Sequence, residues 1–66
     1  METYILFVGC YKGTSFTDGG EQARGQYADD QAAIGALLPK INVLLRHYDR
    51  IEVQIKAGSG REVYRS

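Results

Sequence analysis

The residues best suited to binding a phosphate are the glycines, lysine and hydroxyls of the stretch 9–15 (GCYKGTS). A phosphate loop of the Walker type needs a glycine, four residues and then Gly-Lys-Ser/Thr, opening directly onto a helix. Here Lys12 precedes Gly13, and the expected helix begins about 15 residues downstream. The spacing therefore favours a structural turn over a phosphate site.

Nucleophilic or metal chemistry would depend on one cysteine, Cys10, and one histidine, His47. A single residue of each type excludes an intrachain disulfide and a Cys/His zinc site. Cys10 lies in an apolar run, where a thiol is typically a small buried side chain. Asp49 could orient His47 as a base, but no serine or cysteine is placed to complete a triad. We therefore expect no enzyme activity, no metal and no cofactor.

Eight Lys and Arg balance eight Asp and Glu, so the formal net charge is zero. A non-specific nucleic-acid binder normally carries a basic excess, because neutralising phosphates supplies most of its affinity. The apolar run Tyr4 to Val8 is far too short to span a bilayer. A lone thiol suits the cytoplasm. We expect a cytoplasmic protein without membrane association.

Two segments have the composition of strands. The stretch 3–11 is dense in β-branched and aromatic residues, and both of its alternating faces are apolar. The stretch 51–57 (IEVQIKA) alternates between apolar and polar residues, which is typical of a half-buried strand. A turn at 58–60 and a short strand at 61–65 follow.

The stretch 12–20 (KGTSFTDGG) has turn composition, and 21–27 alternates as a second strand hairpinned to the first. The alternative is one long loop over 13–28, which is unusual in so small a domain. Further on, apolar residues recur at spacings of three and four over 30–48, which predicts a helix with one buried face. Asp29 or Asp30 is its expected N-cap. Pro39 predicts a kink or two short helices meeting near Leu38.

These elements predict one α+β domain over residues 1–66. An antiparallel sheet in ββαββ order would carry the Pro39-kinked helix on one face. If residues 13–28 form a loop, the order becomes βαββ.

A single helix covers only one side of a sheet, so one apolar face of the first strand must lie on the uncovered side. If Val53 and its neighbours two residues away face the helix, then the polar residues between them face outward. The outward face of the first strand is one of two sets: Tyr4, Leu6, Val8 and Cys10, or Ile5, Phe7 and Tyr11. The candidate binding surface takes the first set together with polar and aromatic neighbours: Tyr4, Leu6, Val8, Cys10, Arg24, Glu52, Gln54, Lys56 and Tyr64.

An apolar stripe on an open sheet favours a non-enzymatic protein-binding module, either a homodimer or one that binds a larger protein. Small inhibitors of host complexes made by phages and mobile elements, anti-CRISPR proteins among them, are an analogy at the level of class. The alternative is binding of RNA, single-stranded nucleic acid or a nucleotide. In that case Tyr4 and Tyr64 would stack on bases and scattered arginines would contact phosphates.

Overall fold

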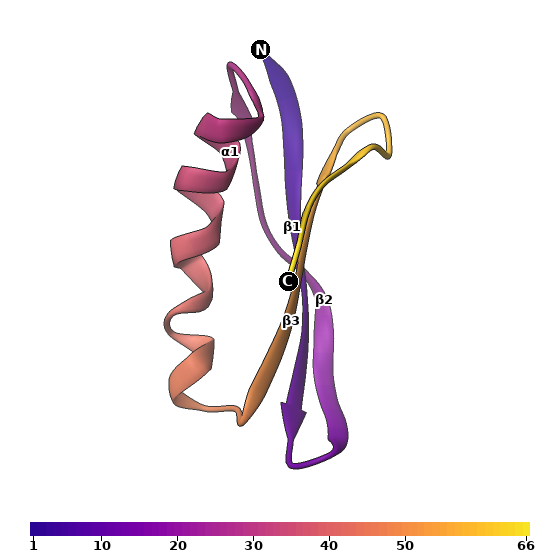
Figure 1. Cartoon of the computed structure of the whole chain (residues 1–66), viewed down its shortest axis with the longest axis vertical. Helices are drawn as coiled ribbons and strands as arrows, with labels where there is room; N and C mark the ends of the chain where they lie inside the picture. Colours follow the sequence, from indigo (N-terminus) through magenta and orange to yellow (C-terminus); the bar gives the residue numbers. More distant parts are fainter.

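The computed structural model describes all of residues 1–66 as a sheet with a helical layer on one of its faces (Figure 1). The elements in chain order are β1 (Glu2–Lys12), β2 (Ser15–Tyr27), α1 (Asp30–Leu37), the 3₁₀ turns η1 (Leu38–Ile41) and η2 (Leu44–Arg46), β3 (Arg50–Ala57) and β4 (Glu62–Arg65). The four strands form one antiparallel sheet in the order β2-β1-β3-β4. The predicted ββαββ order is confirmed, and the βαββ alternative is wrong.

Strand β2 is much longer than the sequence suggests. It begins at Ser15 and runs for 13 residues, so most of the expected turn over 12–20 is strand. Only Gly13 and Thr14 form the turn. Gly13 has a φ of 61°, and its amide donates to the carboxylate of Asp49. Because β1 is itself 11 residues long and offers a partner for nearly every residue of β2, pairing outweighs the turn-like composition of this segment.

Two bulges in β2 decide which side chains share a face of the sheet. The register with β1 shifts by one residue at Gln22 and again at Thr17. Side chains alternate between the two faces with a period of two. Each extra residue therefore reverses which side chains beyond it lie on which face. As a result Glu21 lies on the same face as Arg24, and Phe16 pairs with Tyr11.

The helical layer starts as predicted and then departs from a regular helix. The Asp29 side chain accepts a hydrogen bond from the Ala32 amide at 2.8 Å, which caps α1. The α-helix ends at Leu37, two residues before Pro39, which has no N–H to donate to residue 35. The chain continues as two 3₁₀ turns, consistent with the expected break near Leu38.

The expectation of one buried apolar face over 30–48 is only partly correct. No residue of η1 or η2 is fully buried, and Leu45 is 52% exposed. Leu38, Ile41, Leu44 and Tyr48 still pack partly buried against the core. The fully buried residues of the helical layer are confined to α1.

The hydrophobic core lies between α1 and the two central strands. It consists of Tyr4, Leu6, Val8 and Cys10 from β1, Ala33 and Leu37 from α1, and Val53, Ile55 and Ala57 from β3. The prediction that Cys10 is a small buried side chain is confirmed. Burial raises the pKa of its thiol, and Asp18 adds to the effect.

A polar clasp joins the start of β1, the start of α1 and the turn before β4. The hydroxyl of Tyr4 donates to Oδ1 of Asp30 at 2.8 Å and lies 3.2 Å from Glu2. Arg61 holds both oxygens of Asp30, at 2.8 and 3.0 Å. The bonds from Arg61 and then Tyr4 lower the pKa of Asp30 to about 2. The bond to Asp30, with burial second, raises the pKa of Tyr4 to about 12.

Candidate functional site

The side of the sheet away from the helical layer, here called the outer sheet face, is not covered by any other element (Figure 1). Directly paired residues of antiparallel strands share a face. The core side chains of β1 pair with Ile51, Val53, Ile55 and Ala57, so they face the helix. The alternate residues of β1 form the outer set: Ile5, Phe7, Gly9 and Tyr11, paired with Lys56, Gln54, Glu52 and Arg50 of β3.

The register between β1 and β3 therefore shows that the candidate surface contains the wrong face of β1. Tyr4, Leu6, Val8 and Cys10, the set predicted to face outward, are instead buried under the helical layer. They face inward because they are in register with the apolar face of β3, and one helix must cover both sets. The outward set is the second alternative, Ile5, Phe7 and Tyr11.

The remaining candidate residues divide between the two sides of the sheet. Tyr64 pairs with Ile55, so it belongs to the helix-facing side, where it is half-buried against the core. Four polar candidates do lie on the outer sheet face: Arg24 of β2 and Glu52, Gln54 and Lys56 of β3. The outward direction expected for the polar residues of β3 is thus confirmed, and their role in binding stays a prediction.

Phe16 is the most exposed aromatic side chain of this face, at 61%. Its ring meets Tyr11 edge to face, with 5.5 Å between ring centroids. It also lies over the paired glycines Gly9 and Gly19. A Cβ at Gly19 would stand 2.8 Å from the Phe16 ring and 2.9 Å from the Val8 carbonyl oxygen, so this position requires glycine.

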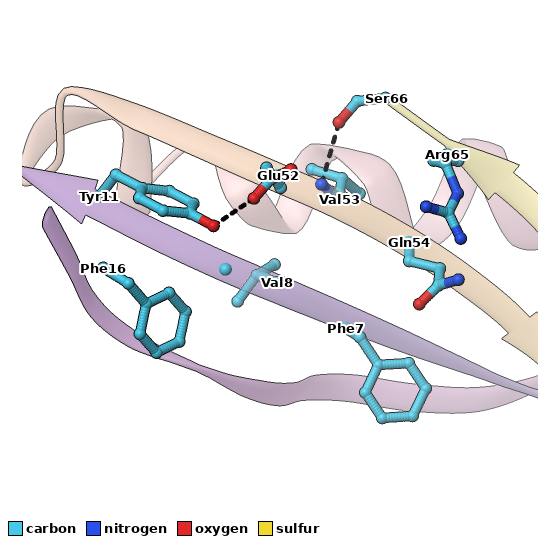
Figure 2. A pocket seen from close by; sticks show the side chains of 10 residues that line it. Phe7, Val8, Tyr11, Phe16, Glu52, Val53, Gln54, Arg65 and Ser66 are labelled. Carbon is cyan, nitrogen blue, oxygen red and sulfur yellow. Dashed lines mark hydrogen bonds between the residues drawn. The ribbon is translucent and has the colours of Figure 1, made fainter. Parts of the chain in front are cut away.

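A hollow of about 300 Å³ opens beside this glycine pair (Figure 2). Figure 2 shows the rings of Phe7 and Phe16 on the side of β2, with Tyr11 and Glu52 on the side of β3. The hollow is lined by Phe7, Val8, Gly9, Tyr11, Phe16, Glu52, Val53, Gln54, Arg65 and Ser66. Its size and mixed apolar and polar wall suit a large side chain better than an extended ligand.

Hydrogen bonds hold the polar wall of the hollow in place. The Tyr11 hydroxyl donates to Glu52, which raises the pKa of Tyr11. The guanidinium of Arg50 stacks over the Tyr11 ring, 4.1 Å from the ring centroid.

Glu62 organises the opposite end of this wall. It accepts from Arg65 Nε at 2.7 Å and from Gln54 Nε2 at 2.8 Å. Two hydrogen bonds join Ser66 to Val53: the Ser66 amide donates to the Val53 carbonyl oxygen, and the Val53 amide donates to the Ser66 hydroxyl. These hydrogen bonds define the orientation of the side chains in the wall.

The sequence prediction missed Phe16 and the glycine pair, and it listed Phe7 only in the alternative set. One signal in the sequence was usable. The outward set contains Gly9 between Phe7 and Tyr11, whereas the inward set has a side chain at every position. A gap in the middle of a face packs poorly under a helix, and this favours the outward orientation.

The residues considered for catalysis are not brought together. His47 is exposed, and the Asp49 carboxylate accepts from the Gly13 amide. No three His, Cys, Asp or Glu side chains lie close enough to hold a metal ion. None of the helices has the length and apolar character needed to cross a membrane. No family model, curated protein or solved structure matches this chain.

Proposed function

We propose that this protein is a non-enzymatic protein-binding module that inhibits a larger protein complex in the cytoplasm by occupying part of its surface with the outer sheet face. The observation that carries the proposal is the uncovered aromatic cluster of Phe7, Tyr11 and Phe16 around a preformed hollow. Aromatic side chains around a pocket with a polar rim are typical of the energetic centre of a protein interface.

The dimensions of the molecule support a single docking event. It extends 37, 20 and 15 Å along its principal axes. One face of a body of this size is comparable to the roughly 800 Å² that each partner buries in a standard interface. A small inhibitor of the phage or mobile-element class, such as an anti-CRISPR protein, would act in this way, by steric occupation rather than chemistry.

The alternative function, nucleic-acid binding, depends on two tyrosines that would stack on bases, and neither lies on the outer sheet face. Tyr4 is 1% exposed, and Tyr64 lies on the helix-facing side. Two of the arginines on the outer sheet face are also engaged, since Arg24 pairs with Glu21 and Arg65 with Glu62. These contacts reduce the positive charge that is available for phosphates.

Affinity capture from the natural host, followed by reconstitution with the purified captured protein, tests the proposal. Phe16→Asp should abolish binding, because it puts a charge at the centre of the aromatic cluster. Gln31→Asp is the matched control, since Gln31 is exposed on α1 and the change in charge is the same. Binding should depend only weakly on salt, whereas phosphate contacts would give a steep dependence.

Three results would contradict the proposal. One is equal binding by the Phe16 and Gln31 variants. Another is capture of nucleic acid with a steep salt dependence. A third is a pure protein that sediments as a dimer which Phe16→Asp dissociates, because the occupant of the outer sheet face would then be a second copy and not a host protein.

A further inference from the structure

The helical layer carries a second exposed apolar surface, on the opposite side of the molecule from the outer sheet face. Val43 is 62% exposed and Leu45 is 52% exposed. The same layer carries a hollow of about 340 Å³, lined by Ile34, Gly35, Leu38, Pro39, Ile41 and Asn42. All six residues belong to α1 and the turns that follow it, and none comes from the sheet. We call this region, residues 34–46, the helical surface.

The charged side chains carried by the helical segment itself have one sign. The segment 31–48 contains no Asp or Glu, and all eight acidic residues lie elsewhere in the chain. Lys40 lies between two residues that line the hollow, and Arg46 follows Leu45. Both are exposed, and neither takes part in an ion pair, although Arg24, Arg61 and Arg65 are all paired. The helical segment is therefore basic within a protein that is neutral overall.

We propose that the helical surface binds an acidic amphipathic segment of a protein partner, with an apolar side chain in the hollow and carboxylates against Lys40 and Arg46. Basic residues near the end of a helical segment also interact favourably with its dipole. That effect is confined to the last turn of a helix, and α1 ends at Leu37, so it accounts neither for the position of Arg46 nor for the exposure of Val43 and Leu45. A partner with apolar side chains and carboxylates satisfies both features at once.

A protein partner fits this surface better than an anionic membrane does. Segments that bind acidic lipids through charge carry clusters of four to eight basic residues. The helical surface has only two basic residues, Lys40 and Arg46. A discrete hollow also selects an individual side chain, whereas a lipid surface needs only a continuous apolar stripe.

Two model peptides of the same length test the proposal, each with capped ends. One places Leu on one helix face and Glu on the other, and its match has Lys at every Glu position. Each is titrated into the ¹⁵N-labelled full chain. We expect the Glu peptide to shift amides of residues 34–46 saturably, and the Lys peptide to bind at least about tenfold more weakly, because complementary charge selects between partners of equal hydrophobicity.

The double variant Lys40→Glu, Arg46→Glu should reverse this preference and bind the Lys peptide instead. Leu45→Ser should weaken both peptides. Phe16→Asp should leave peptide binding unchanged. The outer sheet face and the helical surface can therefore each fail as a binding site without affecting the result for the other. Equal binding of the two peptides, no saturable binding, or binding only to vesicles containing phosphatidylserine would each overturn the proposal.

Discussion

Both faces of β1 are apolar, but their surroundings differ. Leu6 on one face is fully buried under α1, whereas Phe7, the next residue, lies at the edge of an open hollow. One face completes the core, and the other is uncovered. The difference does not originate in β1 itself. The difference comes from β3, which has only one apolar face. The face of β1 that is in register with this apolar face of β3 is the one that packs against the helix.

This comparison shows that the fate of a strand face depends on its neighbours in the sheet. A strand that is apolar on both sides is usually covered on both sides. Here only one layer of helix is present, so the second apolar face becomes a surface. The aromatic residues of that surface are supported by glycines in place of a second layer.

Substituting neighbouring residues on the two faces should give the largest contrast. We expect Leu6→Gln to destabilise the fold by about 3–5 kcal/mol, from lost burial and an unsatisfied amide. Domains of this size have little more stability than that. Phe7→Gln should cost only about 1 kcal/mol, because its side chain is already partly in water. Urea unfolding measures both. Similar losses from the two substitutions would show that the two faces do not differ in burial.

Adding one methyl group at either of two glycines should sharpen the comparison further. Gly19→Ala is expected to cost about 1–3 kcal/mol, because its Cβ collides with the Phe16 ring and the Val8 carbonyl. Gly35→Ala on α1 is the control, since a Cβ there meets nothing within 4 Å. It should stabilise the protein by about 0.5–1 kcal/mol. Thermal unfolding measures both changes in stability. If Gly19→Ala left the stability unchanged, that would contradict the packing of Phe16 over the glycine pair.

The smallest expected effect is at the end of the buried face, where the Tyr4 hydroxyl joins the polar clasp. The folded state holds the pKa of Asp30 at about 2, below its ordinary value of 3.8. The stabilisation from this carboxylate is therefore present above about pH 4 and is lost as the pH falls toward 2. Asp30→Asn should flatten the decline in stability over this interval. Urea midpoints between these two pH values measure the slope.

A second variant identifies the cause of that effect. Arg61→Met removes the largest contribution to the lowered pKa, so the carboxyl carbon of Asp30 should titrate closer to its ordinary value. An unchanged titration would mean that Arg61 does not hold Asp30 in solution.

The number, order and direction of the main elements could be predicted from the sequence. The strict alternation of residues 51–57 and the cap at Asp29 are local signals, and both are confirmed. Two features could not be predicted, because they depend on partners distant in sequence. The length of β2 comes from pairing with β1, which overrides a turn-like composition. The bulges at Gln22 and Thr17 leave no trace in the alternation pattern.

The candidate site was only partly predictable for the same reason. The polar residues of β3 were placed on the correct side, because their own strand alternates clearly. The apolar residues of β1 offered two equal sets, and choosing between them needs the register with β3. Phe16 was missed because the segment 12–20 has turn composition, so its residues were not assigned to either face of the sheet.

The bulges have another consequence, which concerns self-assembly into fibrils. Strand β2 forms one edge of the sheet over 13 residues, and such an edge presents a row of free N–H and C=O groups. A straight edge of this length would be a template for adding further strands without limit. Bulges interrupt the spacing of those groups and increase the local twist, so an incoming strand cannot pair along the whole length. The two bulges thus also hinder amyloid growth from a glycine-rich edge strand that carries only three charged side chains, Asp18, Glu21 and Arg24.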